Sequence, residues 1–331
     1  MKFLSIIIPV YKVEKYVGAT LQSIIDQRQD LFDYEVIVVD DGTPDKSMEV
    51  VESFSQQLPQ MTIIHQENKG LSGARNTGFN ASVGKYVWFV DSDDILAPKA
   101  FEILWGILQQ TDAEIYTFSL QAFHDGEKEL HAMRTIYAKN PPSYYGRVFT
   151  GFQLHNIIGS GIAPKIVFAH SFLAENQLLF LEKIYHEDME FLARAFFFTK
   201  RMYVSDKVLY IYRLRNSGSI MAERNEKHLG SIIQIMDSFE GFKKKYAKTA
   251  EEKSFMDSHI FALAISLFCL NDSVVQGYSS FMHRHENKIR RRGIRAGFSA
   301  LRFLTIGQFA KLWFLIFIPF LLRKLWVKKR R

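Results

Sequence analysis

The stretch Tyr86-Val87-Trp88-Phe89-Val90-Asp91-Ser92-Asp93-Asp94 decides the fold, because a short apolar run leads directly into a cluster of acids. Apolar runs of this kind, bounded by turn residues, are typical of strands that are covered on both faces of a parallel sheet. Ligands of such sheets bind at the carboxyl ends of the strands. The acidic cluster therefore falls where a ligand is expected.

The residues before this stretch alternate strand-like and helix-like patterns. Strands are predicted at 4–8, 35–39 and Met61–His65, and the second of them ends at Asp40-Asp41. Helices are predicted after the first two strands by apolar residues at helical spacing, and Ser72 is expected to cap a third helix that runs to about Ala81. The alternation implies an α/β fold with parallel strands and right-handed crossovers.

The rest of the chain divides into a mixed part and a helical part. Residues 111–222 contain short strands, loops and one clear helix that begins near Glu187, and a strand follows at 208–214. From about 225 onward the apolar residues recur at helical spacing. We therefore expect one domain over 1–222, with halves at 1–110 and 111–222, and a helical extension over 223–331.

Composition limits the class of protein. Hydrophobic residues make up 47% of the 331 residues and charged residues 23%, which excludes wholesale disorder. Cys269 is the single cysteine, so an internal disulfide is excluded, as fits a reducing compartment.

The charge is unevenly distributed, and the C-terminal tail is strongly basic. From Arg284 to Arg331 there are 14 Lys/Arg against one acid, whereas residues 1–283 have 28 Lys/Arg against 34 acids. The tail also holds an apolar run at 312–322, which is shorter than the roughly 20 residues that span a bilayer. Trp313 and Trp326 bracket this run, and Arg290-Arg291-Arg292 precede it.

Two interpretations of the tail remain open. The first is an in-plane anchor on the cytoplasmic leaflet of the membrane, held by anionic lipid. The second is a core or oligomer helix followed by a basic tail. We expect no nucleic acid partner, because the apolar run interrupts the charge.

Asp91 and Asp93 have the chemistry of a metal site. Two carboxylates in a turn can hold Mn²⁺ or Mg²⁺, since these ions prefer oxygen ligands and accept the remaining ones from water and substrate phosphates. The alternative is a solvated acidic turn that caps the helix expected near Pro98.

Three other places carry charged groups that suit a phosphorylated ligand. Asp40 can accept hydrogen bonds from a base or ribose, or it can cap the next helix. Lys69 and Arg75 flank a loop and helix start that could meet phosphate, or they form a surface salt bridge. Glu187 and Asp188 open a helix, where acids are favoured by the dipole, and one of them could accept a proton from a hydroxyl.

Together these motifs resemble the family-2 glycosyltransferases with a GT-A fold, a group that builds bacterial capsule, exopolysaccharide and lipopolysaccharide. The resemblance covers roughly residues 3–220. It rests on segments in this order: Ser5-Ile6-Ile7-Ile8-Pro9-Val10-Tyr11 with Glu14, Val38-Val39-Asp40-Asp41-Gly42-Thr43, Asn68-Lys69-Gly70-Leu71-Ser72-Gly73-Ala74-Arg75-Asn76-Thr77-Gly78, and Gly84-Lys85-Tyr86 leading to Phe89-Val90-Asp91-Ser92-Asp93-Asp94.

The resemblance implies a Rossmann-like, mostly parallel sheet with a nucleotide-binding half and an acceptor half. It implies that Asp188 is the catalytic base, that Asp91 and Asp93 hold the metal with Asp93 the more direct ligand, and that Lys165 and Glu187 lie on the acceptor side. It implies that the nucleotide sugar is bound by Pro9, Tyr11, Glu14, Asp40, Lys69, Arg75, Asp91, Ser92, Arg213 and Arg215. Ala163-Pro164-Lys165 lacks the tryptophan that the family often has before this lysine.

The implied reaction is a single displacement with inversion. Sugar would move from a nucleotide-diphosphate sugar, with UDP the first choice, to a glycan or lipid-linked glycan, at the inner face of the cell membrane. Arg213 and Arg215 could instead be exposed strand-end cations. Two alternatives of another class are an inactive binding or scaffold protein and a nucleotidyltransferase, although the latter would need a Gly-rich loop after the first strand, where Pro9-Val10-Tyr11-Lys12 stands.

Overall fold

The computed structural model describes residues 2–125, 135–138, 142–154, 162–215, 226–268 and 277–299. The chain divides into two compact units, and each is described by itself. The first, here the sheet unit, comprises 1–183 and 187–218. The second, here the helical unit, comprises 184–186 and 219–331. The expected boundary at 222 falls outside the described residues and stays a prediction.

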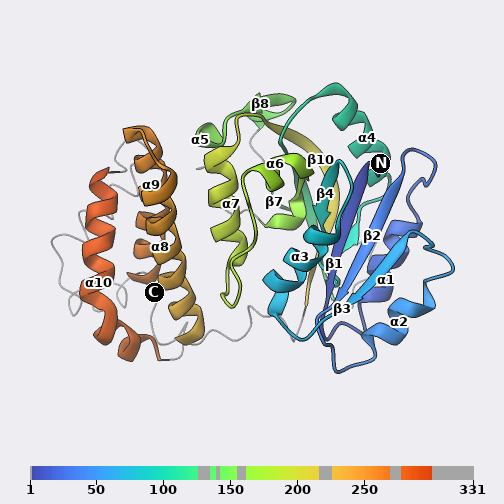
Figure 1. The fold of residues 1–331 in the computed structure, drawn as a ribbon, viewed down its shortest axis with the longest axis horizontal. Coiled ribbons are helices and arrows are strands. Elements are labelled where there is room, and N and C mark those ends of the chain that lie inside the picture. The colour runs from blue at the N-terminus through green and yellow to red at the C-terminus, as the bar shows by residue number, and fades with distance from the viewer. Residues whose placement is uncertain are drawn as a thin grey trace. The chain divides into compact units, whose positions relative to one another are not determined.

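The sheet unit is built on one large sheet (Figure 1). Among the described residues its strands follow the order β3-β2-β1-β4-β9-β6-β10-β5, with β7 beside β6 and β8 beside β10. The strands of this path are β1 (Leu4–Val10), β2 (Tyr34–Asp40), β3 (Met61–His65), β4 (Tyr86–Phe89), β5 (Ile95–Leu96), β6 (Ile115–His124), β9 (Ile166–Ala169) and β10 (Met202–Leu214), and the two beside it are β7 (Thr135–Ala138) and β8 (Arg147–Phe149).

The first four strands are parallel, as the alternating pattern predicts. β9 lies antiparallel between β4 and β6, and the short β5 lies antiparallel to β10. β10 runs parallel to β6. The sheet is therefore mixed, and its parallel half is formed by β1, β2, β3 and β4.

Helices cover both faces of the sheet (Figure 1). One face packs on α1 (Val17–Ile25), α2 (Ser47–Ser53) and α4 (Ala100–Gln110), through a cluster that includes Ile6, Val38, Leu21 and Phe101. The other face meets α3 (Gly70–Ala81), where Ile37 and Val39 contact Ala74. Because β1 is buried along its whole length, it needs apolar side chains on both faces, which explains its unbroken run.

α7 (Glu187–Phe198) also belongs to the sheet unit, and an aromatic cluster ties it to the strands. Phe191 of α7 stacks on Phe180 at 4.0 Å between ring centroids, and both contact Phe89 of β4. The remaining short helices of this unit are η1 (Pro142–Tyr144), α5 (Gly151–Leu154), η2 (Ala163–Lys165) and α6 (His170–Glu175). This packing fixes the first turn of α7 near the end of β4.

Two local predictions were wrong. Ser72 does not cap α3, because the helix begins at Gly70 with Lys69 at the N-cap position, and Ser72 is buried within it. The strand predicted at 208–214 begins six residues earlier, at Met202. Charged residues at its centre, Asp206 and Lys207, break the apolar pattern there and hide its length.

The helical unit contains α8 (Glu226–Tyr246), α9 (Ala250–Phe268) and α10 (Tyr278–Ser299). Buried side chains such as Phe239, Phe255 and Ile289 hold these three helices together. No helix among the described residues has both the length and the apolar composition needed to cross a membrane. Cys269 and the tail at 300–331 lie outside the described residues.

Candidate active site

Arg75 joins three acidic side chains that are far apart in the sequence. It lies on α3, and its side chain is 1% exposed. One terminal nitrogen donates to Asp91 Oδ1 at 2.7 Å, and the other donates to Asp188 Oδ1 at 2.8 Å and to Glu187 Oε1 at 3.1 Å. The guanidinium also lies over the ring of Phe180. Arg75 is thus a buried ion-pair centre, and the interpretation as a surface salt bridge is wrong.

Asp188 is held at both carboxylate oxygens. Oδ1 accepts from Arg75, and Oδ2 accepts from the backbone N–H of Ala163 at 2.9 Å. Each oxygen keeps a second lone pair, so the group can still accept a proton from a hydroxyl. Because α3 and η2 hold Asp188, its carboxylate has one fixed orientation.

Burial changes the acidity of both residues in the first turn of α7. It raises the pKa of Glu187 to about 7, and the neighbouring Asp188 charge adds to the increase. It also raises the pKa of Asp188, although Arg75 opposes the effect. A carboxylate with a raised pKa is a stronger base than a solvated one, which suits proton abstraction near neutral pH.

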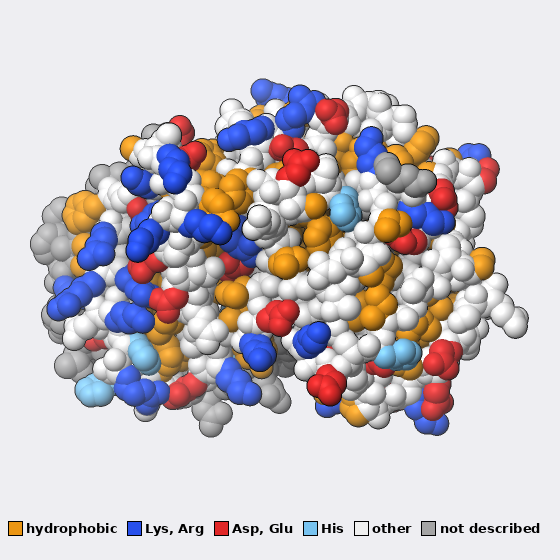
Figure 2. Space-filling model, viewed as in Figure 1, with side chains coloured by type: hydrophobic (Ala, Val, Ile, Leu, Met, Phe, Trp, Pro, Cys, Tyr) orange, Lys and Arg blue, Asp and Glu red, His pale blue; other side chains and the backbone are white. Residues whose placement is uncertain are grey.

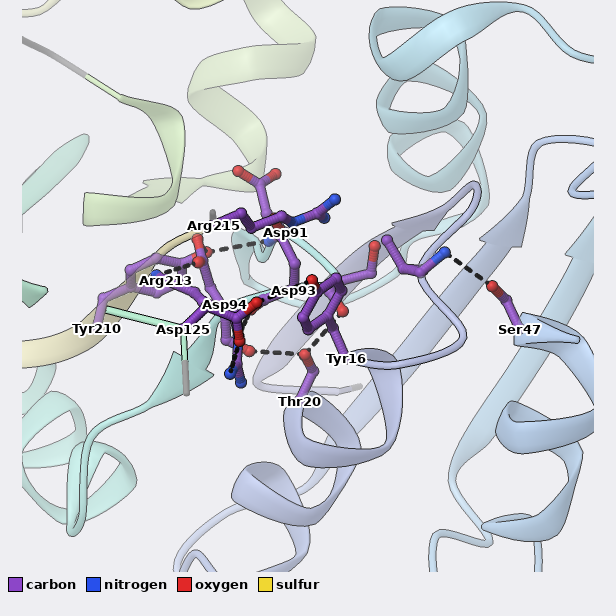
Figure 3. A network of polar contacts seen from close by, with 12 residues as sticks. Tyr16, Thr20, Ser47, Asp91, Asp93, Asp94, Asp125, Tyr210, Arg213 and Arg215 are labelled. Atoms are coloured by element: carbon purple, nitrogen blue, oxygen red, sulfur yellow. Dashed lines mark hydrogen bonds and ion pairs between the residues drawn. The ribbon is translucent and has the colours of Figure 1, made fainter. Parts of the chain in front are cut away.

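The acidic turn after β4 has two different kinds of carboxylate (Figure 3). Asp91 and Asp93 have partly exposed side chains, 24% and 22%, and each pairs with an arginine, Asp91 with Arg75 and Asp93 with Arg215. Asp94 is fully buried. The turn is therefore not a solvated cap, and only its first and third residues offer carboxylates to a ligand.

Asp94 holds the turn in place. It accepts from the hydroxyl of Tyr210 at 2.6 Å and from the backbone N–H of Arg213 at 2.7 Å (Figure 3). Tyr210 in turn accepts from the backbone N–H of Asp91, and the hydroxyl of Thr20 donates to the carbonyls of Ser92 and Asp94. Burial first, and then the charges of Asp93 and Asp91, raise the pKa of Asp94 well above its usual range.

Arg213 and Arg215 are not exposed strand-end cations, since their side chains are 6% and 13% exposed. Arg213 donates from Nε to the carbonyl of Asp93 at 2.8 Å. Both guanidiniums lie over the ring of Tyr16, whose hydroxyl donates to Asp125 at 3.1 Å. The end of β10 therefore brings two cations to the acidic turn.

The other predicted nucleotide residues lie at the ends of β1 and β2. Pro9 is buried in β1, and Tyr11 just after it is 42% exposed. Glu14 accepts from the backbone N–H of Lys46, while Asp40 accepts from the N–H of Thr43 and pairs with His65 at 2.9 Å. The roles of these residues toward a nucleotide stay predictions.

Asp41, rather than Asp40, fixes the loop that leads into α3. Asp41 is 2% exposed, and its carboxylate accepts from the backbone N–H groups of Lys69 and Gly70 at 2.8 and 2.9 Å. The side chain of Lys69 is left exposed. Asp41 thereby fixes the backbone of Lys69, while the side chain of Lys69 stays accessible to a ligand.

Lys165 is 2% exposed and lies in η2, close in sequence to the Ala163 amide that holds Asp188. Burial lowers its pKa to about 8. Trp88 of β4 donates from its indole N–H to the carbonyl of Pro164, the residue before Lys165, at 2.7 Å. The contact of Lys165 with an acceptor stays a prediction.

The carboxylates of Asp91 and Asp93 fit Mn²⁺ or Mg²⁺ as part of a ligand set. Two carboxylates suffice for such an ion when a diphosphate and water supply the remaining oxygens. Among the described residues no group of three or more His, Cys, Asp or Glu is arranged as a complete metal site. The protein alone therefore offers a partial site that a phosphorylated ligand would complete.

Sequence reasoning missed four side chains that support the site: Tyr16, Thr20, Asp125 and Tyr210. Each is an ordinary polar residue of a strand, helix or turn, with no motif of its own. Asp41 and Asp94 stand in the sequence only as neighbours of Asp40 and Asp93. Asp41 and Asp94 differ from Asp40 and Asp93 in being almost completely buried. The sequence of two adjacent acids does not show which of the two is buried.

The sequence is similar to those of known proteins. Residues 5–166 match the family described as "Glycosyl transferase family 2". The chain is 33% identical over 217 residues to the uncharacterized glycosyltransferase EpsJ of Bacillus subtilis, covering 63% of this chain and 60% of EpsJ, less than two thirds of that relative. It is 27% identical to the putative glycosyltransferase EpsH of the same organism, covering 86% of this chain and 81% of EpsH.

Solved structures share the fold. A crystal structure of residues 1–349 of S. aureus TarS in complex with UDP has a TM-score of 0.65 and 20% identity, over 89% of this chain and 80% of that one. The same TarS segment in complex with UDP-GlcNAc has a TM-score of 0.65 and 21% identity, over 89% and 79%. The architecture is thus the GT-A fold, with helices following the sheet, as expected.

Proposed function

Because residues 5–166 of this chain match glycosyl transferase family 2, we propose that the protein transfers a sugar from a UDP-sugar to a hydroxyl of a glycan acceptor, with inversion. The acceptor is proposed to be a lipid-linked glycan of a bacterial surface polymer. Support for the donor comes from the UDP and UDP-GlcNAc named for TarS. Support for the polymer comes from relatives such as a Bacillus poly(ribitol-phosphate) beta-glucosyltransferase, 29% identical over 66% of this chain and 33% of that protein.

One observation carries the proposal: a single guanidinium, that of Arg75, contacts both Asp91 and Asp188. The proposed donor-side acid and the proposed base therefore lie within reach of one side chain. In a displacement reaction the leaving diphosphate and the attacking hydroxyl must be on opposite sides of one carbon atom. Contacts with the same guanidinium keep Asp91 and Asp188 close enough to serve the two sides of one bound sugar.

In the proposed reaction Asp188 accepts the proton of the acceptor hydroxyl. The hydroxyl oxygen forms a bond to the anomeric carbon, and the bond from that carbon to the diphosphate oxygen breaks, so that UDP leaves with the electron pair. Arg75 and the Ala163 N–H keep the base oriented. Arg213 and Arg215 supply positive charge beside the acidic turn.

Asp91 and Asp93 are the residues that would hold Mn²⁺ or Mg²⁺, which when bound would neutralise charge on the departing diphosphate. Asp93→Asn is expected to remove the metal-dependent part of donor binding, measured as the rise in melting temperature on adding UDP with Mn²⁺ over UDP alone. An undiminished metal-dependent rise in this variant would contradict the metal assignment.

Asp188→Asn tests the base. We expect kcat to fall by about 10²–10⁴-fold, the usual contribution of general base catalysis, while the UDP-induced rise in melting temperature stays as in the unmodified protein. The matched control is Asp206→Asn, an equally isosteric change at a half-exposed acid in β10.

A donor screen by melting temperature, followed by turnover assays, distinguishes an enzyme from an inactive scaffold. UDP-, GDP- and dTDP-sugars are screened for stabilisation, and the best donor is then tested for hydrolysis and for transfer to glycan acceptors. A donor that binds and is never turned over, by the unmodified protein or by Asp188→Asn, would support the scaffold instead.

A further inference from the structure

One side of α10 carries a row of cations that ends in an exposed aromatic ring. Its members follow one another at intervals of three or four residues, which puts them on one side of a helix: Arg284, Lys288, Arg291, Arg295 and Phe298. We call this set the α10 basic row. Ile289 and Ala296, which α10 buries, project from the opposite side.

Two cations of the row have no acidic partner among the described residues. Arg284 pairs with Glu226 at 2.9 Å, and Lys288 lies 3.9 Å from Asp237. Arg291 and Arg295, one turn apart and both exposed, form no ion pair with any residue that the structure describes. Their charge is therefore available to a ligand.

A shallow groove within the helical unit extends the positive surface from α10 to α8. Its lining includes Arg291 and Arg295 from α10 and Lys243 and Lys244 from α8. Figure 2 shows Lys and Arg side chains gathered over these helices. The acids of the groove are already neutralised, since Glu240 pairs with Arg292 and Asp257 pairs with Lys243.

The exposed ring of Phe298 decides between two anionic ligands, a soluble phosphate polymer and a lipid bilayer. Phe298 is 57% exposed, so its ring meets solvent at the end of the row. A soluble phosphate polymer gains little from a ring beside the cations, whereas aromatic rings and cations are found together at the headgroup level of bilayers. The chain also continues from α10 toward the apolar run at 312–322 and the cations after it.

We propose that the α10 basic row docks the helical unit onto a bilayer of anionic lipid, with Arg291 and Arg295 on lipid phosphates and Phe298 at the headgroup level. This surface is separate from the tail itself, since it uses the folded helices α8 and α10. It also goes beyond the transferase reaction, because none of its residues belongs to the sheet unit.

The test measures binding of the full chain to phosphatidylcholine vesicles with and without phosphatidylglycerol, at physiological ionic strength. Arg291→Gln/Arg295→Gln is expected to weaken binding to the anionic vesicles by about thirtyfold, given the usual contribution of a cation near an anionic surface. Lys200→Gln/Lys253→Gln removes two exposed cations outside the row and is expected to change binding by less than about threefold. Equal binding by the two double variants would overturn the proposal.

A second measurement does not depend on removing charge. An environment-sensitive dye is attached to the cysteine of Phe298→Cys, in a Cys269→Ser background. Its emission should rise and shift to the blue with anionic vesicles but not with phosphatidylcholine vesicles. Unchanged emission overturns the proposal. A second result would also overturn it: Arg291→Gln/Arg295→Gln loses binding to soluble polyphosphate but still binds the vesicles. The groove would then bind an anionic polymer rather than lipid.

Failure of the membrane proposal can be distinguished from failure of the proposed transferase reaction. Without vesicles, Arg291→Gln/Arg295→Gln should melt and hydrolyse donor as the unmodified protein does. Asp93→Asn, impaired in donor binding, should bind anionic vesicles normally.

Discussion

At the scale of single residues, Arg75 determines the charge balance of the site. One buried guanidinium faces the carboxylates of Asp91, Glu187 and Asp188. Burial alone would lower the pKa of Arg75, but these three acids raise it above its ordinary value, so the cation is permanent. The acids outnumber it, which leaves a negative site beside the acidic turn.

Arg75→Met should destabilise the protein by about 3–5 kcal/mol, because it leaves buried carboxylates without their cation. The loss should shrink at low pH, since protonation removes the unpaired charges. Urea unfolding of both proteins at pH 7 and pH 5 checks this. As a control, Arg28→Met removes an exposed arginine that also pairs with an acid, Asp30, and should change the stability far less, because solvent screens this pair.

Lys165→Met should alter how stability depends on pH. Burial lowers the pKa of Lys165 from 10.5 to about 8, so between these values the unfolded chain binds a proton that the native protein does not. The free energy of unfolding contributed by this residue therefore rises with pH across that window, by up to about 3 kcal/mol. Urea unfolding at pH 7.5 and at pH 10 should show this rise in the unmodified protein relative to Lys165→Met, and parallel pH dependences would contradict it.

At the scale of elements, α3 must approach the sheet closely to deliver Arg75. Gly78 permits this, because a Cβ there would lie 2.3 Å from Ile7 Cγ2 and 3.3 Å from Val39 Cγ2. α3 therefore rests on β1 and β2 with backbone rather than side chain at this point. A larger residue would push the helix outward.

Gly78→Ala should cost about 1–3 kcal/mol and lower donor affinity, since overpacking would displace α3 and with it Arg75. Gly106→Ala is the matched control in α4, where a Cβ would meet nothing within 4 Å. That change should stabilise by about 0.5–1 kcal/mol through helix propensity. Thermal melts of both, with and without UDP, provide the comparison, and equal stabilisation by the two alanines would contradict the close approach.

The elements with strong periodicity could be predicted from the sequence, and the contacts between them could not. β3 was predicted at its observed bounds, because its apolar run ends at clear turn residues. The two-residue β5 carries too few side chains to show a pattern, and Ser72 has the right residue type for a cap but lies inside α3. Arg75 and Asp188 are 113 positions apart, so their pairing depends on the packing of α3 and α7, which no local pattern encodes.

At the scale of the whole molecule, the chain has two compact units with different chemistry. Every predicted catalytic and donor residue belongs to the sheet unit, whereas the α10 basic row belongs to the helical unit. A ligand of the site should therefore stabilise the sheet unit directly.

Calorimetry should show two transitions, of which UDP with Mn²⁺ raises only one. Phe255→Ala, at a fully buried position of α9, should lower the other by removing about 3–5 kcal/mol of packing. A single transition that both treatments move together would mean that the units unfold as one.

The shared guanidinium of Arg75 has a consequence for how the sequence can change over time. Loss of Asp91, Glu187 or Asp188 would alter the charge balance of the other two. Loss of Arg75 would leave all three acids without their cation. Among descendants of this gene, positions 75, 91, 187 and 188 should accordingly be kept or replaced as a set, while the exposed position of Lys69 drifts independently.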